Sequence, residues 1–204
     1  MPAQATTDCV LFPDLFAKPI VAQFDQDLAS SDGSAILLKA ADRRLGLTEA
    51  LGACLADHRQ ASKVVHELAD LLTQRLLAIA CGYPDVNDAA RLREDPIHKL
   101  LLGRDPLIRQ HLASQPTLSR FENSVTRQDL LRLSEALADA VIARHRRRLR
   151  GKVRRVAVDL DVSHDPAHGL QQLTFFNGHY DTRCYLTLFA FLSFNDEPEQ
   201  YLSA

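Results

Sequence analysis

Apolar residues recur every three or four positions over most of the first 150 residues, which is the period of a helix that buries one face. The pattern predicts helices over about 34–45, 48–56 and 61–80. Gly46 follows the first of these helices and Gly82 follows the third, and glycine is common just past a helix end. This part of the chain is therefore predicted to be a bundle of short helices.

Capping signals predict further helices. Two Asp-Pro steps, Asp95-Pro96 and Asp105-Pro106, place a good N-cap before a proline that suits the first turn. We expect a short helix after each of them. Thr126 and Asp129 resemble a capping box, because the two side chains can each satisfy an amide of the other. The long helix that starts there is expected to bury its apolar side chains, which are Leu130, Leu133, Leu137 and Val141.

From Val153 onward the apolar period changes to two, which is the period of a strand. Val156, Val158 and Leu160 point to one face; Ala157, Asp159 and Asp161 point to the other. A polar turn follows, and residues 173–180 and 184–194 are rich in the aromatic and branched residues that favour strands. The fold class is thus expected to be α+β, with a mostly helical region over 1–150 and antiparallel strands over 151–204.

Composition excludes several classes of protein. The 204 residues are 46% hydrophobic and 25% charged, with a formal net charge of −2, which excludes collagen, a disordered tail and a disulfide-stapled miniprotein. The four cysteines form no close pair, and the N-terminus lacks the basic start and apolar core of a signal peptide. Since no apolar run is long enough to span a bilayer, we expect a cytoplasmic protein with reduced thiols and no membrane partner.

The net charge conceals a strongly basic segment. Residues 140–158 hold eight Lys and Arg and no acid, whereas residues 159–204 carry a net charge of −6. Cations this dense repel one another unless an anion lies near, so we predict contacts with nucleic-acid phosphates. The residues expected to make them are Arg146, Arg147, Arg148, Arg150 and Lys152. The alternative is a solvated helix end, where cations suit the helix dipole.

Two further patterns could hold a metal ion. Asp159 and Asp161 share a strand face, and paired carboxylates suit a hard cation such as Mg²⁺, although such pairs are often only the exposed side of an edge strand. His164 and His168 have a spacing that could bind zinc on a helix. The proline and glycine nearby favour a polar turn instead.

Residues 40–51 have the form of a helix-turn-helix, with a glycine in the turn and Thr48 at the start of the second helix. That second helix carries Glu49 and Asp57 but no Arg or Lys before Arg59, whereas a helix that reads bases usually offers more donors. Direct DNA recognition and simple helical packing both remain open for this segment.

The stretch from Ser114 to Asn123, Ser-Gln-Pro-Thr-Leu-Ser-Arg-Phe-Glu-Asn, resembles a signature of bacterial insertion-sequence transposases of the DDE type, in the family numbered thirteen-eighty. Other segments agree with that family in the same order along nearly the whole chain. They are Ser31-Asp32-Gly33, residues 41–47, Ala80-Cys81-Gly82-Tyr83, Asn87-Asp88, Asp95-Pro96, Val158-Asp159-Leu160-Asp161, Asp165-Pro166, His168-Gly169 and Tyr180-Asp181.

The resemblance implies a DNA transposase that cleaves and joins phosphodiesters with two Mg²⁺ ions. It implies a helical region that engages the transposon terminal repeats, followed by a ribonuclease-H-like domain in which two Asp and one Glu hold the metals. Asp161-Val162-Ser163 matches the family pattern around the first catalytic Asp, so Asp161 is the expected catalytic residue and metal ligand. Asp159 is the alternative ligand, and Arg120 of the signature joins the expected DNA contacts.

The family pattern places its second Asp and its Glu on later elements, and no acid after Asp161 has that context. We therefore expect an N-terminal part of a transposase, containing the first three strands of its catalytic domain, inactive alone and prone to form homo-oligomers through an open strand edge. A non-catalytic DNA-binding protein that represses transposition is the alternative function. A residual gene product without function is a third interpretation.

Overall fold

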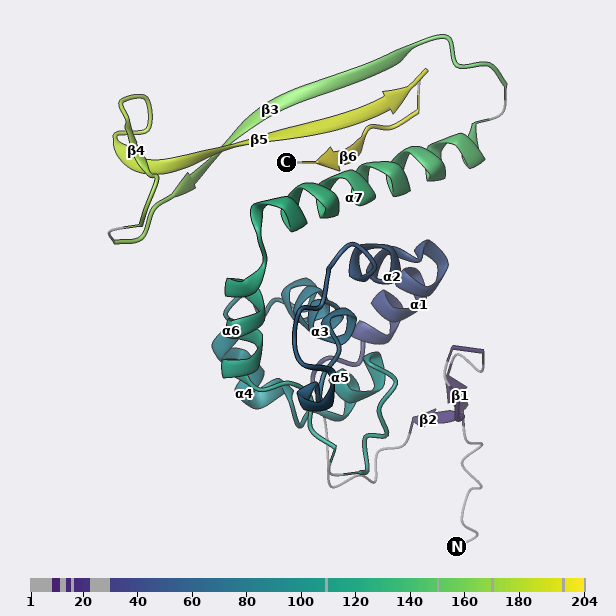
Figure 1. Cartoon of the computed structure of the whole chain (residues 1–204). Helices are drawn as coiled ribbons and strands as arrows, with labels where there is room; N and C mark the ends of the chain where they lie inside the picture. The colour runs from purple at the N-terminus through teal and green to yellow at the C-terminus, as the bar shows by residue number, and fades with distance from the viewer. Residues whose placement is uncertain are drawn as a thin grey trace, which may run out of the picture. The chain divides into compact units, whose positions relative to one another are not determined.

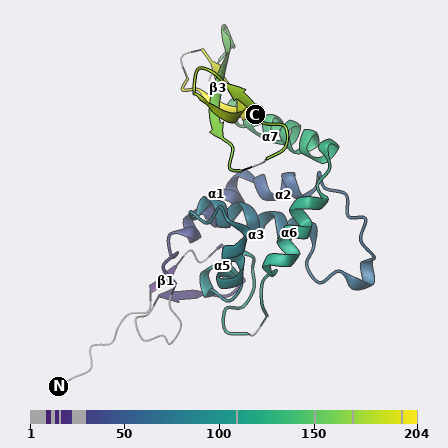
Figure 2. The same cartoon turned by 90° about the vertical axis from the view of Figure 1, so that its left-hand side faces the viewer.

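The structure, a computed structural model, describes residues 9–11, 14–15, 17–22, 30–108, 110–149, 151–169, 171–195 and 197–203. Contacts divide the chain into two compact units, Met1–Asp129 and Leu130–Ala204, which we call the helical unit and the sheet unit. Figures 1 and 2 show short helices gathered in the first and a long β-hairpin in the second. Helices and antiparallel strands in one chain confirm the α+β class.

The helical unit begins with a two-stranded antiparallel ladder in which Val10 pairs with Val21. Its elements are β1 (Cys9–Leu11), β2 (Ile20–Ala22), α1 (Ala35–Leu45), α2 (Leu47–Gly52), η1 (Ala61–Lys63), α3 (Leu68–Ala80), η2 (Val86–Asp88), α4 (Ala89–Leu92), α5 (Pro96–Leu101) and α6 (Gln115–Ser124).

The helical unit has a closed apolar core. Ala35 of α1, Leu77 of α3 and Leu101 of α5 meet there, and Leu101 is completely inaccessible to solvent. Leu71, Leu112 and Leu118 are also almost fully buried. Burial of one such leucine contributes about 1.5–3 kcal/mol to folding, so these helices are held mainly by the shared core rather than by their own propensity.

A buried glutamine joins α3 to the segment before α6. The Gln74 amide donates to the Ala113 carbonyl oxygen at 3.0 Å and accepts from the Ala113 N–H at 3.0 Å. Gln74 is 3% exposed, so its polar atoms are out of water and depend on these two bonds. The two hydrogen bonds with Gln74 satisfy the backbone N–H and carbonyl of Ala113, as a neighbouring strand would do in a sheet.

A second polar network ties the start of α1 to α5. The Asp32 carboxylate lies 2.9 Å from Nε2 of His98 and accepts a hydrogen bond from the Tyr83 hydroxyl at 3.0 Å. Burial by itself raises the pKa of Asp32, but the hydrogen bonds from His98, Tyr83 and Ser31 outweigh it and hold that pKa below its usual value. The carboxylate therefore stays ionised against a fully buried histidine.

Three expected helices of this unit differ from the structure. α3 begins at Leu68 rather than near 61, because Val64 and Val65 do not face the core and Val65 is 82% exposed. α2 starts at Leu47 and ends at Gly52. Among the described residues no helix follows Asp105-Pro106, where Asp105 accepts from the Leu107 N–H and from Nζ of Lys18. The other Asp-Pro step does start a helix, since Asp95 accepts from both first-turn amides of α5.

The sheet unit contains most of α7 (Arg127–Arg148) and one antiparallel sheet. Its strands are β3 (Val156–Pro166), β4 (Phe175–Asn177), β5 (Thr182–Phe194) and β6 (Gln200–Ser203). β3 pairs with β5 along its whole length, while β4 and β6 pair with opposite ends of β5. The sequence predicts three strands here; β6, which pairs with β5 through Phe191 and Tyr201, is the one that it misses.

The capping box at the start of α7 is confirmed, because Thr126 and Asp129 exchange hydrogen bonds in both directions. The expected buried stripe of α7 is wrong. Leu130 is 58% exposed, and Leu133, Leu137 and Val141 are only partly covered.

Candidate nucleic-acid interface and acidic strand

The basic segment is split between the end of α7 and the entry to β3. Arg144, Arg146, Arg147 and Arg148 lie in the last turns of α7 and are exposed. Their charges suit the negative end of the helix dipole, but four cations exceed what one dipole balances. Arg148 lies 3.7 Å from Glu197, a loose and solvent-exposed pair. This helix end therefore offers a cluster of accessible guanidinium groups.

The second half of the basic segment is partly used by the fold. The N–H groups of Arg154 and Arg155 donate to the Asn195 side-chain oxygen at 2.8 and 3.2 Å, and the Arg155 guanidinium donates to the Asn195 carbonyl. These bonds fasten the start of β3 to the end of β5. Lys152 is exposed, and Arg150 lies outside the described residues. Arg154 and Arg155 both remain exposed, so the anchoring is made by their backbone N–H groups and by the Arg155 guanidinium.

One histidine inside the basic segment points away from solvent. His145 is 2% exposed, and its ring lies 5.2 Å from that of Phe194. Neither ring nitrogen has a hydrogen-bond partner in the described part of the chain. The His145 ring therefore packs α7 against the sheet as an apolar side chain would, while the neighbouring arginines are exposed to solvent.

Asp159 and Asp161 lie on the same face of β3, as the alternation predicts. Their cross-strand partners on β5 are Phe191 and Phe189, so both carboxylates stand beside aromatic rings on that face. Both residues are exposed. Carboxylate oxygens are the donors that Mg²⁺ prefers, so their chemistry fits the expected ion. Two carboxylates are nevertheless too few to form a metal site, and no group of three or more His, Cys, Asp or Glu side chains converges anywhere in the described residues.

The proposed zinc spacing lies in and after the last residues of β3, which extends to Pro166 instead of turning at His164. The His164 ring stacks on Tyr180 at 4.3 Å between centroids and 24° between planes. The His168 amide donates to Gln171 in the following loop. The structure therefore does not bring these histidines together as a metal site among the described residues. The expected polar turn is wrong for His164, Asp165 and Pro166, because all three pair with β5, and irregular backbone begins only after Pro166.

The expected order of helix, glycine and second helix is present as α1, Gly46 and α2. Gly46 has φ 65°, a left-handed conformation that glycine adopts without strain and that ends α1. The Asp42 carboxylate accepts from the Thr48 N–H at 2.9 Å and from its hydroxyl at 2.6 Å. Asp42 rather than Thr48 therefore caps the second helix. α2 has only six residues and one charged side chain, Glu49.

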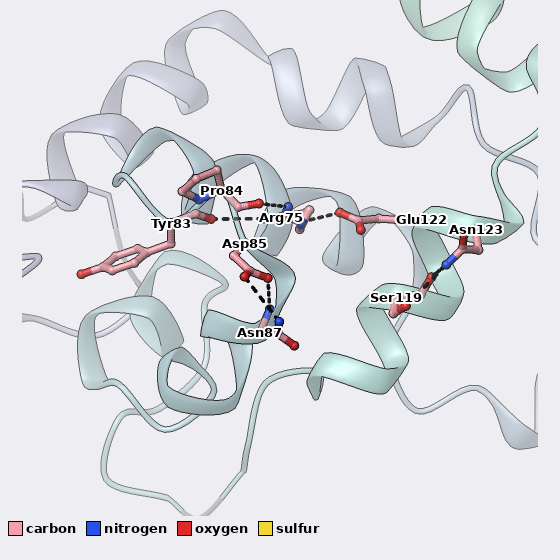
Figure 3. A network of polar contacts seen from close by, with 8 residues as sticks. All are labelled: Arg75, Tyr83, Pro84, Asp85, Asn87, Ser119, Glu122 and Asn123. Atoms are coloured by element: carbon pink, nitrogen blue, oxygen red, sulfur yellow. Dashed lines mark hydrogen bonds and ion pairs between the residues drawn. The ribbon is translucent and has the colours of Figure 1, made fainter. Parts of the chain in front are cut away.

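The transposase-like signature forms α6 and is tied into the helical unit by an ion pair (Figure 3). Glu122 pairs with the Arg75 guanidinium of α3, which also donates to the carbonyl oxygens of Tyr83 and Pro84. Asn123 donates to the Ser119 carbonyl at 2.7 Å. Arg120 points outward from the same helix and is exposed. The signature thus combines an internal anchor with an external polar face.

Sequence reasoning does not single out Arg75 or the Asp32–His98–Tyr83 network. Arg75 lies within a helix whose apolar stripe dominates the pattern, and nothing in its spacing marks it. Asp32 and Tyr83 do fall in two of the family-like segments, 51 residues apart, and the structure places them in contact. The one sequence signal for this network is that Asp32 and Tyr83 both lie in segments that resemble the transposase family.

A family model described as transposase DDE domain group 1 matches residues 12–203. The chain belongs to this family of transposase DDE domains. No curated protein and no solved structure matches it. The family places the chain among proteins of DNA transposition, which generally use a divalent metal. No helix in the described residues is long and apolar enough to cross a membrane.

In this transposase domain the expected DNA-contacting cations and the expected metal-binding carboxylates occupy different elements. The exposed cations lie on α7 and on the entry to β3, and the carboxylates lie on β3 itself. All of them except Arg120 lie in the sheet unit; Arg120 stands on α6 in the helical unit.

Proposed function

We propose that this transposase domain belongs to the insertion-sequence family numbered thirteen-eighty and binds the terminal repeats of its element. The observation that carries the proposal is the family match over residues 12–203. The exposed guanidinium groups at the end of α7 support it, because arginines there can contact several phosphates without reading sequence. Arg146, Arg147 and Arg148 make these contacts, with Arg150 and Lys152 following along the chain.

We further propose that the sheet is the start of a ribonuclease-H-like catalytic domain and that Asp161 is its first metal ligand. Asp159, on the same face, is the alternative first ligand. These two carboxylates would be the first to hold a Mg²⁺ ion, which would supply a Lewis acid for phosphodiester chemistry. β3 contributes the strand that holds these carboxylates at the exposed surface.

Residues 1–204 by themselves are proposed not to cleave DNA. Two metal ions about 3.5–4 Å apart need more carboxylates than one strand face supplies. The support comes from the described residues, in which Asp159 and Asp161 have no third ligand beside them. Incubation of the purified chain with Mg²⁺ and DNA of the element's ends should give no nicks or double-strand breaks. Cleavage that is lost in Asp161→Asn would refute this part of the proposal.

DNA binding is tested by replacing Arg146, Arg147 and Arg148 with alanine and measuring fluorescence anisotropy of a labelled duplex over a range of salt. Loss of three phosphate contacts should lower the slope of log K against log salt by roughly 2–3. A variant with Arg43, Arg44 and Lys63 changed to alanine is the control, since it loses three exposed cations of the helical unit. An equal loss in the control would contradict specific phosphate contacts at the end of α7, and a loss confined to the control would assign them to the helical unit.

Metal binding is tested separately with Mn²⁺, whose unpaired electrons broaden nearby NMR signals. The amides of residues 159–161 should broaden at millimolar-range Mn²⁺, the weak affinity expected of two exposed carboxylates. Asp161→Asn should reduce the broadening more than Asp159→Asn. The reverse order would make Asp159 the first ligand, and no selective broadening would remove the metal site from the proposal.

A non-catalytic DNA-binding protein that represses transposition is the second candidate. The α1–α2 turn favours it, because the hydrogen bonds from Thr48 to Asp42 order a helix-turn-helix without any metal. This candidate predicts DNA binding together with no selective Mn²⁺ broadening. It also predicts that the Arg43, Arg44 and Lys63 variant is the one that loses binding.

Self-association is proposed from the exposed apolar residues of β3. Val158 and Leu160 are 57% and 60% exposed, and among the described residues β3 pairs with β5 alone. Open edges beside apolar side chains favour pairing between copies. Size-exclusion chromatography with light scattering should show a mass that rises with concentration. A monomer at all concentrations would contradict the homo-oligomer.

A further inference from the structure

The helical unit presents one helix whose polar face is free of packing. α6 buries Leu118 and Phe121, which are 2% and 6% exposed, against the rest of the unit. Arg120 and Asn123 stand on the opposite side and are exposed. Because they are three residues apart, they lie on one face of the helix. α6 is therefore amphipathic, and its outer face carries two strong hydrogen-bonding side chains.

The charge on this face is positive. The only acid of α6, Glu122, is paired with Arg75, so its charge is locally compensated. Arg120 forms no ion pair within the described residues, and its guanidinium donates a long hydrogen bond of 3.5 Å to the Thr117 hydroxyl. Arg127, exposed in the first turn of α7, adds a cation four residues after Asn123. The outer face of α6 therefore carries one cation, Arg120, and the one acid of the helix is paired.

The two side chains have the chemistry of base recognition. Arginine pairs in bidentate fashion with guanine, and asparagine pairs with adenine, on the edges exposed in the major groove. The hydrogen bond from Asn123 to the Ser119 carbonyl positions the amide along the helix and leaves its carbonyl oxygen without a partner in the described residues (Figure 3). Three residues of helix rise about 4.5 Å, close to the ~3.4 Å step between base pairs, so the two can meet neighbouring pairs.

α2, the second helix of the helix-turn-helix pattern, lacks these properties. It has six residues, and its one polar hydroxyl, Thr48, is held by Asp42 at 2.6 Å. Its one charge is that of Glu49, an acceptor that phosphates repel. The donors that base recognition requires are on α6 rather than on α2.

We propose that the outer face of α6, formed by Arg120 and Asn123, reads base edges in the major groove of the DNA end that the chain binds. This inference rests on the proposed DNA-binding function and deepens it, because it assigns sequence recognition to the helical unit. The cations of α7 then supply affinity without sequence preference.

The test selects bound molecules from a library of duplexes with a random centre about two helical turns long, so the sequence of the terminal repeat is not required. The full chain should enrich one motif. Asn123→Ala and Arg120→Ala should each lose roughly tenfold preference at one base pair, at adjacent positions of that motif. Their affinity for a fixed duplex of unrelated sequence should change by less than about threefold.

Arg120→Lys keeps the charge and the exposed stem but loses the bidentate fork, so it should lose the base preference while retaining the affinity for unrelated duplex. Glu49→Ala is the matched control on α2 and should enrich the wild-type motif. Far-ultraviolet circular dichroism confirms that each variant is folded.

The inference is overturned if both α6 variants enrich the wild-type motif, if Glu49→Ala changes the motif instead, or if the wild-type chain binds duplexes without enriching any sequence. Absence of all DNA binding would refute the proposed function itself, a result that the anisotropy measurement identifies on its own.

Discussion

The helical unit and the sheet unit use similar apolar patterns with opposite results. In the helical unit the recurring leucines meet, and Leu71, Leu101 and Leu112 are almost fully enclosed. In the sheet unit the alternating apolar residues of β3 share a face, yet Val158 and Leu160 remain more than half exposed. A hydrophobic period specifies which side chains point the same way. Whether they are buried depends on a second surface that packs against them.

The largest expected effect separates the two units directly. Leu101→Ala should lower the free energy of unfolding of the helical unit by about 2–5 kcal/mol, because it leaves a cavity in a closed core. Leu160→Ala should change stability by less than about 1 kcal/mol, since its side chain is mostly in water already. Urea unfolding followed by circular dichroism measures both. Equal losses would mean that the face of β3 is covered in solution.

A smaller loss is expected from the polar interior of the helical unit. Gln74→Ala should destabilise that unit by roughly 2–4 kcal/mol, because it strands the buried N–H and carbonyl of Ala113. Thr73→Ala on the same helix, at a half-buried position, is the comparison. A loss no greater than that of the comparison would show that water replaces the glutamine.

The Asp32 network should give the helical unit a stability that depends on acid. Since the pKa of Asp32 is lowered on folding, the stabilisation is present above the pKa of the unfolded carboxyl and is lost as the pH falls through the lowered folded value. Asp32→Asn should remove this dependence and cost about 1–3 kcal/mol near neutral pH, because the buried ring of His98 loses an ionised partner. Thermal melts of both proteins from neutral to acidic pH check this. An unchanged pH profile would contradict it.

The smallest change is expected at His145. His145→Phe should leave the stability of the sheet unit unchanged or raise it by about 1 kcal/mol, because the ring keeps its contact with Phe194 and no hydrogen bond within the described residues is lost. Thermal melting measured by near-ultraviolet signals reports on it. A clear loss would reveal a partner for the imidazole.

Sequence reasoning is most successful where the signal is local. The capping box at Thr126, the Asp95-Pro96 helix start and the two-residue period of β3 each depend on neighbours within a few positions, and the structure contains all three. The start of α3 and the missing helix after Pro106 depend on whether Val65 and Leu107 find a core, which is decided by distant residues. Local propensity cannot supply that information.

The same distinction applies to the site. Alternation alone puts Asp159 and Asp161 on one face, and the arginine run is visible in the charge count. The hydrogen bond from the Arg155 guanidinium to the Asn195 carbonyl depends on a residue 40 positions away, which the charge count does not reveal. The link between Arg75 and Glu122 spans 47 positions, so the internal role of the signature could not be separated from its outward one without the fold.

Because β3 pairs with β5 along its whole length, the register of the two strands decides which side chains of β3 share a face with Phe189 and Phe191. Because successive side chains alternate, a slip of one residue against Phe189 and Phe191 would carry the carboxylates to the valine side and the valines to the carboxylate side. A change in the length of the connection between the two strands therefore preserves the acidic face only if β3 and β5 keep their present pairing register. A one-residue insertion within β3 itself would replace the acidic face of the strand by an apolar one without preventing the strand from forming.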